Sequence, residues 1–230
     1  MKLTADYHTH TIFSHGKGCV ADNVEAAISR GLNTIGITDH SVGHALYGVK
    51  RRELGNYLNS IVQAKETYAG RIDVKTGMEL NLTGLSGSFD LPEGDFDVLI
   101  LGYHKAAWCA DLKTAWTFFR GKRVDAITQG YVNALKTGRI TIVSHPGYGV
   151  PVNYRLLARA CADYGALFEI NEKHTDLKPE DIAEAAAEPV RFVLSSDAHR
   201  PEDVGSVPRA LEFVQRTGLS PARIVNITED

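Results

Sequence analysis

The stretch Asp6-Tyr7-His8-Thr9-His10 decides how the rest of the chain is interpreted, and it runs on through Thr11-Ile12-Phe13-Ser14 to His15. We expect a strand from Leu3 to His8. Side chains two apart on a strand point to the same face, so His8 and His10 would leave its end together as a pair of metal ligands. Alone, a His-x-His pair is weak evidence, because such histidines are often surface or packed residues.

The same arrangement, a short apolar run followed by a residue that can bind metal, recurs along the chain. The runs and the residues at their ends are 34–38 with Asp39 and His40, 72–80 with Glu79, 98–103 with His104, 140–144 with His145, 166–170 with Asn171, and 190–196 with Asp197 and His199. Helical patterns lie between them, over 24–30 with Asp22 as N-cap, 53–68, 125–135, 154–164, 180–187 and 208–216.

Seven near-continuous apolar strands that alternate with helices predict a parallel sheet covered on its outside. Barrel enzymes build their sites at the C-terminal ends of such strands. A flat sheet would spread those ends along a line, whereas a closed sheet brings them together. We therefore predict an α/β fold, a distorted (β/α)7 TIM-like barrel, formed by residues 1–230 as a single domain.

Composition limits the function classes. The formal net charge is −3 and no run of Lys and Arg is longer than three residues, which argues against long nucleic acid and anionic membrane as partners. No apolar run approaches about 18 residues and no charged-then-apolar leader is present, so we expect neither a membrane span nor a signal peptide. Three scattered cysteines, Cys19, Cys109 and Cys161, fit reduced, packed thiols of a cytoplasmic protein, with a ligand role for Cys19 as the alternative.

Taken together, the strand-end motifs closely resemble those of the PHP (polymerase and histidinol phosphatase) family of metal-dependent phosphoesterases. The matching pieces are His8-Thr9-His10, Thr38-Asp39-His40, Gly77-Met78-Glu79, Gly102-Tyr103-His104, Ser144-His145-Pro146 and Ser196-Asp197-Ala198-His199. They span almost the whole chain in the family's order, and the short chain resembles the compact stand-alone members. The resemblance implies a seven-stranded barrel that holds three metal ions.

The resemblance also implies the ligands, with Glu79 shared between two ions. The three groups are His8, His10, Glu79 and Asp197; His15, His40 and His199; and Glu79, His104 and His145. These side chains are too few to occupy every coordination position of three ions that take roughly four or five ligands each. Open positions therefore remain, and the sites look catalytic. Imidazole and carboxylate ligands suit Zn²⁺ first, with Mn²⁺ or Fe²⁺ next, better than Mg²⁺.

The resulting prediction is a phosphoric monoester hydrolase that uses a metal-held hydroxide on a small phosphorylated substrate, with inorganic phosphate as the other natural occupant of a cationic pocket. Asp39 would either protonate the leaving group or hydrogen-bond a ligand imidazole. Lys105 and Arg200 follow ligands directly and would either contact phosphate oxygens or lie solvated on loops. Alternatives are a histidinol-phosphate phosphatase, a nucleotide phosphodiesterase with a base on Trp108 or Tyr148, and a non-catalytic metal-binding sensor.

Substrate specificity is expected in the loops 41–52, 81–96, 105–121 and 171–179. The aromatic residues of 105–121 are assigned to helix packing rather than to a lid or a subunit contact. We expect His44 and His174 at the surface or the substrate rim, not on metal. Asn171 would orient substrate or cap a turn.

Overall fold

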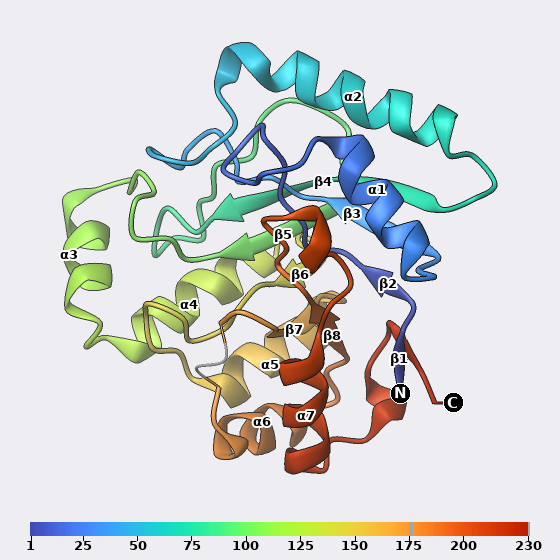
Figure 1. Cartoon of the computed structure of the whole chain (residues 1–230). Coiled ribbons are helices and arrows are strands. Elements are labelled where there is room, and N and C mark those ends of the chain that lie inside the picture. Colours follow the sequence, from blue (N-terminus) through green and yellow to red (C-terminus); the bar gives the residue numbers. More distant parts are fainter. Residues whose placement is uncertain (175–176, 230) are drawn as a thin grey trace.

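Figure 1 shows the computed structural model of the chain, which describes residues 1–174 and 177–229. The strands are β1 (Lys2–Leu3), β2 (Ala5–Asp6), β3 (Thr34–Ile37), β4 (Asp73–Asn81), β5 (Val98–Gly102), β6 (Ile142–Val143), β7 (Leu167–Asn171), β8 (Phe192–Ser195) and β9 (Ile227–Thr228). The α-helices are α1 (Val20–Ser29), α2 (Leu54–Thr67), α3 (Leu112–Arg120), α4 (Val124–Leu135), α5 (Tyr154–Tyr164), α6 (Pro179–Ala186) and α7 (Pro208–Thr217). Short 3₁₀ helices cover Arg51–Glu53, Pro201–Asp203 and Pro221–Arg223.

Seven strands form one parallel sheet whose spatial order, β2-β3-β4-β5-β6-β7-β8, is their order in the chain. The two end strands meet just beyond their C-terminal ends, where Thr9 and Ala198 form a parallel bridge. The amide of His10 donates to the carbonyl of Ala198 at 2.8 Å across this bridge. The sheet therefore closes, and the predicted (β/α)7 barrel is confirmed.

Below that bridge, side chains fill the seam between β2 and β8. The amide group of Asn226 donates to the carbonyls of Ala5 and Leu194, both at 2.7 Å, and its oxygen accepts from the amide of Leu194 at 3.0 Å. Asp6 accepts from the amide of Ser196 at 3.2 Å. Asn226 and Asp6 thus satisfy buried backbone groups that a strand-to-strand ladder would otherwise pair.

Alternate residues of the strands belong to two separate apolar clusters. The small cluster consists of Val98, Ile100, Ile142 and Val193, and the large one contains their chain neighbours Leu99, Leu101, Val143 and Leu194 together with helix residues. Since successive side chains point to opposite faces, the small cluster fills the barrel and the large one lies under the helices. The inward-facing row that pairs with Val98 and Ile100 on β4 carries Glu79 and ends at Asn81. The barrel interior therefore changes from apolar to polar toward the C-terminal strand ends.

Two local predictions at the N-terminus were wrong. The strand expected from Leu3 to His8 is divided, because β1 pairs antiparallel with β9 while β2 enters the barrel. The amide of Thr4, between them, donates to Asn226 instead of a barrel strand. Helix α1 begins at Val20, not Val24, and Asp22 lies inside its first turn, where its carboxylate accepts from the amide of Cys19 at 2.8 Å.

The aromatic segment 105–121 departs most from expectation. Of its four aromatic side chains, only that of Phe118 is buried, in contact with the Tyr103 ring, as helix packing requires. Trp108 is 72% exposed, Leu112 90% and Phe119 81%. Figure 1 places α3 beyond the arrowheads of β4 and β5, so this helix projects from the C-terminal end of the barrel and its apolar stripe lies uncovered.

Within the described ranges, no helix combines the length and the apolar character that crossing a membrane requires.

We predict that Asn226→Ala lowers the free energy of unfolding by about 3 kcal/mol, because it leaves buried backbone groups on both sides of the seam unpaired. Urea denaturation measures this change. Asn56→Ala on the exposed side of α2 is the control and should change stability by less than about 0.5 kcal/mol. Equal effects of the two substitutions would contradict the role of Asn226 in closing the barrel.

Candidate metal centre

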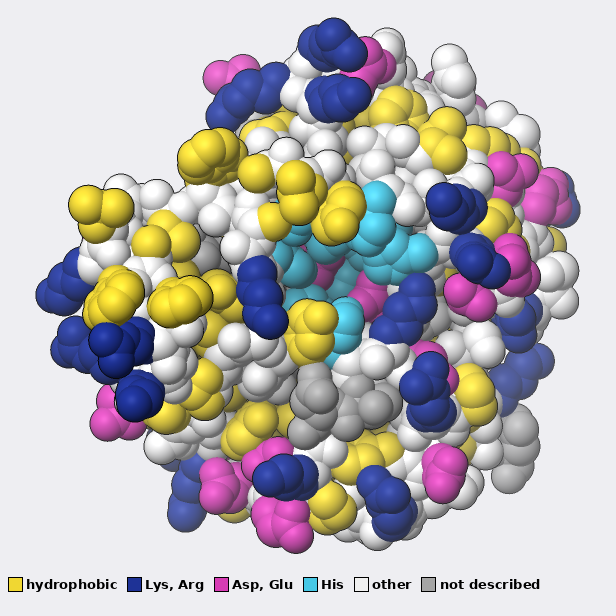
Figure 2. Space-filling view, turned by 60° about the vertical axis from the view of Figure 1, so that its left-hand side comes forward, with side chains coloured by type: hydrophobic (Ala, Val, Ile, Leu, Met, Phe, Trp, Pro, Cys, Tyr) yellow, Lys and Arg dark blue, Asp and Glu magenta, His cyan; other side chains and the backbone are white. Residues whose placement is uncertain are grey.

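A hollow of about 360 Å³ lies at the C-terminal ends of the barrel strands, and we call it the cup. Figure 2 shows its histidines gathered around acidic side chains, with Lys and Arg side chains at the rim. Seven of the nine predicted ligands line it: His15, His40, Glu79, His104, His145, Asp197 and His199. The other two, His8 and His10, are fully buried against Glu79 and Asp197. All nine side chains, which come from distant parts of the sequence, thus meet in one place.

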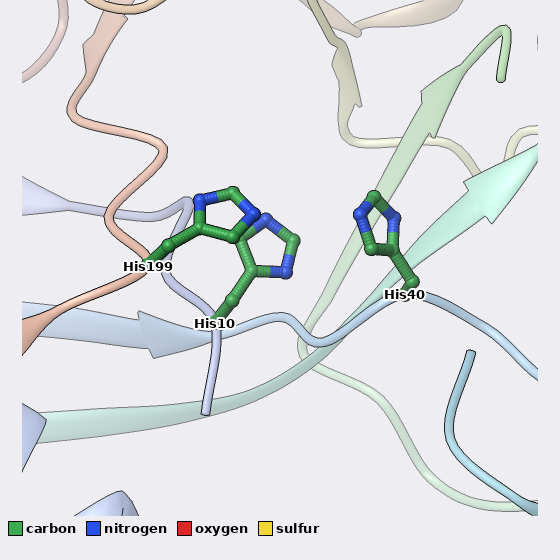
Figure 3. A group of neighbouring side chains, drawn as sticks. All are labelled: His10, His40 and His199. Carbon is green, nitrogen blue, oxygen red and sulfur yellow. The ribbon is translucent and has the colours of Figure 1, made fainter. Parts of the chain in front are cut away.

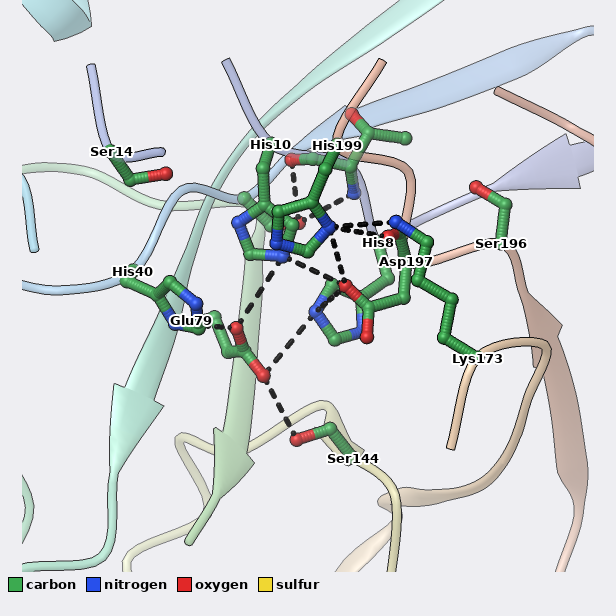
Figure 4. Close-up of polar contacts among 12 residues, drawn as sticks. His8, His10, Ser14, His40, Glu79, Ser144, Lys173, Ser196, Asp197 and His199 are labelled. Atoms are coloured by element: carbon green, nitrogen blue, oxygen red, sulfur yellow. Dashed lines mark hydrogen bonds and ion pairs between the residues drawn. The ribbon is translucent and has the colours of Figure 1, made fainter. Parts of the chain in front are cut away.

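Glu79 lies at the centre of this cluster and is 1% exposed. Five imidazole nitrogens approach its two oxygens, at 3.3 Å for His8, 3.5 Å for His10, 2.8 Å for His40, 3.2 Å for His104 and 3.0 Å for His145. Figure 4 shows the carboxylate reaching between the histidines from its place on β4. Both carboxylate oxygens of Glu79 therefore face imidazole nitrogens, and the shared-ligand role that the family resemblance implied stays a prediction.

Asp197 is the second carboxylate of the cup. Its Oδ1 lies 3.1 Å from Nε2 of His10 and 3.8 Å from Nε2 of His8. Asn171 donates to Oδ2 at 3.2 Å, so this strand-end residue holds a carboxylate in place. Among the described non-glycine residues, only Asp197 and His145 have positive φ angles, 52° and 29°. Such backbone strain persists where the surrounding structure enforces it, here at two predicted ligands.

A group of imidazoles, those of His15, His40 and His199, lies beside these two carboxylates. The ring of His15 is 5.0 Å from that of His40 and 4.1 Å from that of His199, measured between centroids. His10, His40 and His199 each offer a ligand atom within 4.8 Å of the others, and Figure 3 shows how these three rings are disposed. His8, His10 and Glu79 form one further such group, and His40, Glu79 and His104 another. The geometric groups overlap the sets that the sequence implied, with His10 joining His40 and His199.

The cluster contains several buried polar atoms that have no hydrogen-bond partner. Among the described residues, buried atoms without a hydrogen-bond partner include nitrogens of His8, His10, His15, His40, His104 and His145 and Oε2 of Glu79. Nδ1 of His40 and Oε2 of Glu79 are only 2.8 Å apart, yet neither makes a hydrogen bond. Unpaired buried polar atoms are costly and rare in proteins. Their concentration here fits a site that binds cations.

The ligand spacing fits the same interpretation. Two ligands bonded at about 2.0–2.2 Å to one tetrahedral ion are about 3.4 Å apart. The distances from Glu79 to His8, His10 and His104 are 3.2–3.5 Å, and that from His10 to Asp197 is 3.1 Å. Small adjustments of these side chains would complete such shells.

The protonation states of His15, His104 and Glu79 suit metal binding, whereas the carboxylates around His8 favour its protonated form in the metal-free chain. Burial lowers the pKa of His104 to about 4 and, with the neighbouring His199 and His40, that of His15 to about 3, so both are neutral near pH 7. Burial opposes the ionisation of Glu79, but the imidazoles of His8 and His40 hold the pKa of this carboxyl well below its usual value. Neutral imidazole and ionised carboxylate are the forms that bind metal.

Asp39 does not reach the cup. It is fully buried, and it accepts hydrogen bonds from the amides of Thr11 at 2.8 Å and Ser14 at 3.1 Å and from both hydroxyls. It contacts no ligand imidazole, so neither expected role is supported. The carboxylate instead fixes the turn that carries His15.

The two side chains predicted to bind phosphate, Lys105 and Arg200, lie in different places. Lys105 lines the cup. The side chain of Arg200 is 61% exposed, lies 3.8 Å from the carboxylate of Glu202 and does not line the cup, which matches the alternative of a solvated loop residue. Lys173, which sequence reasoning missed, does line it, with Nζ 2.9 Å from Nδ1 of His199.

The two histidines that were not assigned as ligands both line the cup, and His44 is buried there. His44 stacks on His40 with ring centroids 4.9 Å apart, and His174 packs on Tyr148 at 3.8 Å. Cys19 is outside the cup, at the start of α1. Residues 175 and 176 of the expected specificity loop 171–179 lie outside the described residues.

Glu169 is the main residue that sequence reasoning missed. It is fully buried in β7, and Oε1 lies 2.7 Å from Nδ1 of His8, while Oε2 accepts from the amide of His145 at 2.7 Å. Burial lowers the pKa of His8, but the carboxylates of Glu79 and Glu169 outweigh it and raise that pKa well above its usual value. Glu169 thus orients one predicted ligand and anchors the backbone of another. An acidic residue inside an apolar strand was the available signal.

Comparisons with known proteins agree on one family. The PHP domain model matches residues 6–188. Curated relatives include a probable phosphatase of Thermoanaerobacter sp. strain X514, 29% identical over 239 residues that cover 98% of this chain and 91% of the relative. A probable phosphatase of Shewanella sp. strain MR-4 is 25% identical, with 98% and 88% covered.

Two solved structures share the fold. Histidinol phosphate phosphatase from Lactococcus lactis, complexed with zinc, L-histidinol and phosphate, superposes with a TM-score of 0.65 at 17% identity over 96% of this chain and 95% of that one. A putative histidinol phosphatase from Listeria monocytogenes gives 0.58 at 13% identity, with 88% and 97% covered.

We predict that Glu169→Gln weakens metal binding about 10-fold to 100-fold, because the amide cannot orient and polarise His8 as the carboxylate does. Titration of the metal-free protein with Zn²⁺ against a competing chelator measures this affinity. Glu66→Gln on the exposed side of α2 is the control and should bind as the parent chain does. Unchanged affinity in Glu169→Gln would contradict the positioning role.

Proposed function

The chain belongs to the PHP domain family, and from this premise we propose that it is a metal-dependent phosphoesterase that hydrolyses small phosphomonoesters. The observation that carries the proposal is the convergence of unpaired imidazole nitrogens on the buried carboxylate of Glu79. Relatives described as probable phosphatases support it, as does the shared fold of a phosphatase solved with zinc and phosphate.

We propose that nine side chains hold three divalent ions, with Zn²⁺ as the first candidate. They are His8, His10, His15, His40, Glu79, His104, His145, Asp197 and His199. When bound, such ions lower the pKa of water to about 7, which supplies a nucleophile, and they neutralise the phosphate oxygens. The predicted ligands provide two formal negative charges against these ions, from Glu79 and Asp197, and Glu169 behind His8 adds a third, fewer than the six positive charges of three divalent ions, so the loaded cup attracts an anion.

The remaining side chains of the cup hold and orient the substrate in this proposal. The side chains of Lys105 and Lys173 both line the cup, and we assign their ammonium groups as donors to the outer phosphate oxygens. Donors that meet charge as it builds in the transition state stabilise that state more than the bound substrate. Asp39 has no access to the cup, and we assign it no proton transfer.

We predict that His8→Ala and Asp197→Ala each lower phosphate release from a simple alkyl phosphate by at least about 100-fold in zinc-loaded protein, with circular dichroism unchanged. Each variant should also hold less zinc by elemental analysis. Cys19→Ser is the control and should keep the zinc content and activity of the parent chain. Full turnover in both ligand variants would overturn the proposal, and so would metal-loaded parent protein that binds phosphate without turning over any monoester.

We also predict that Lys173→Ala weakens competitive inhibition by inorganic phosphate about 10-fold, because it removes one donor to the anion. The charge-matched control is Lys136→Ala near α4, which lies away from the cup and should leave the inhibition constant unchanged. An inhibition constant that is the same in Lys173→Ala as in the parent chain would remove this residue from the phosphate site.

A further inference from the structure

A second hollow, of about 880 Å³, opens beside the cup along α3, and we call it the side groove. Four residues, Tyr103, His104, Lys105 and Gly149, line both hollows. His104 is the link, because its Nε2 lies 3.2 Å from Glu79 in the cup while the residue also lines the groove. A phosphate in the cup would therefore have its leaving group at the inner end of the groove.

The walls of the side groove are apolar and largely uncovered. Trp108, Leu112 and Phe119 line it and are 72%, 90% and 81% exposed. Phe118 and Tyr103 pack together at 4.9 Å between ring centroids and form its buried wall. Exposed apolar surface of this kind marks binding sites on soluble proteins. The helix that bears it is fixed on the barrel, since the carboxylate of Asp111 caps α3 by accepting from the amide of Thr114 at 2.7 Å.

The charges of the groove disfavour a cationic leaving group. Asp111 is the acidic residue of its lining, and both of its oxygens are engaged by Thr114, at 2.7 Å to the amide and 2.9 Å to the hydroxyl. Lys105 stands where groove and cup join. An amino alcohol such as histidinol would place its ammonium group near the ammonium group of Lys105, and Asp111, the one acidic residue of the lining, already holds the start of α3. A leaving group without charge would lose nothing.

We propose that the side groove binds the leaving group, and that the substrates of this enzyme are phosphomonoesters of bulky apolar or aryl-bearing alcohols. This inference rests on the proposed phosphatase function. The occupant is a part of the substrate rather than a second copy of the chain, because the apolar wall continues inward to His104 and the cup. A hollow of this size accepts a medium-sized organic group, and such pockets bind mainly through apolar contacts.

The test compares n-alkyl phosphates from ethyl to hexyl, and 3-phenylpropyl phosphate, below the concentrations at which they form micelles. Their alcohols have similar acidity, so differences in kcat/KM report binding of the leaving group rather than the ease of its departure. We expect kcat/KM to rise about twofold to fourfold per methylene group. Trp108→Ala and Phe119→Ala should each lower the hexyl-to-ethyl ratio about 10-fold. Leu156→Ala, an exposed leucine on α5, is the control and should leave that ratio unchanged.

A binding readout that needs no turnover is also available. The chain has two tryptophans, Trp108 and Trp116, so Trp116→Phe leaves Trp108 as the single indole reporter. Hexylphosphonate should change its fluorescence at concentrations at least 10-fold below those that ethylphosphonate requires. Equal responses to the two phosphonates would overturn the inference.

The outcomes separate this inference from the proposed function. If the parent chain and the variants hydrolyse every ester and kcat/KM does not change along the alkyl series, the groove assignment is overturned and the phosphatase proposal stands. No turnover of any ester by metal-loaded protein would overturn the phosphatase proposal and this inference with it, and a hexylphosphonate response alone would then show only an apolar binding groove. A sedimentation shift from dimer to monomer in Trp108→Ala with an unchanged hexyl-to-ethyl ratio would assign the stripe to a contact between copies and overturn the inference.

Discussion

The burial of an ionised carboxylate, Glu79, is the constraint on which the rest of this structure depends. At 1% exposure it has lost its hydration, and the cost of such desolvation is several kcal/mol unless opposite charge or strong donors replace the water. The chain surrounds it with imidazoles, of which those of His15 and His104 are held neutral by low pKa values. Neutral imidazoles offer lone pairs but no charge, and His8, whose pKa is raised well above its usual value, is the imidazole that offers charge. Bound cations would complete this environment of Glu79, around which the other predicted ligands lie.

The barrel meets this constraint through topology. Seven parallel strands bring their C-terminal ends to one rim, and the closing bridge between Thr9 and Ala198 joins the first ligand segment to the last. The same bridge lies between His8 and His10 on one side and next to Asp197 on the other, so closure of the barrel and assembly of the cup are one event. Asn226 and Asp6 protect the open part of the seam. Stability and function are therefore coupled at this edge of the sheet.

The barrel followed from the regular alternation of strands and helices, and closure of the barrel predicted that strand-end side chains gather, while the grouping of nine ligands was implied by the resemblance to the PHP family. Strands ended by His, Asp or Glu define a rim, and a closed parallel sheet converges on it. Asp39 and Arg200 are each next to a predicted ligand in the sequence. Side chains of neighbouring residues point in different directions, however, so a position beside a ligand does not show that a side chain enters the cup. Glu169 was missed for a different reason. A single acidic residue within an apolar strand is noticeable, but the sequence does not show that its side chain faces inward. The exposure of α3 depends on the absence of a covering element, which no local pattern encodes.

The cup and the side groove come from different layers of the molecule. The cup is built by strand ends whose direction is fixed by the pleat and by barrel closure, so a change there disturbs the fold as well as the chemistry. The groove is built by α3 and the segment that leads into it, inserted between β5 and α4 and anchored by its own cap at Asp111. Side chains on this helix line a groove that shares Tyr103, His104, Lys105 and Gly149 with the cup, without entering the barrel interior. In the proposed function, a rigid barrel thus holds the predicted metal ligands in place while a helix outside it selects the substrate that reaches them.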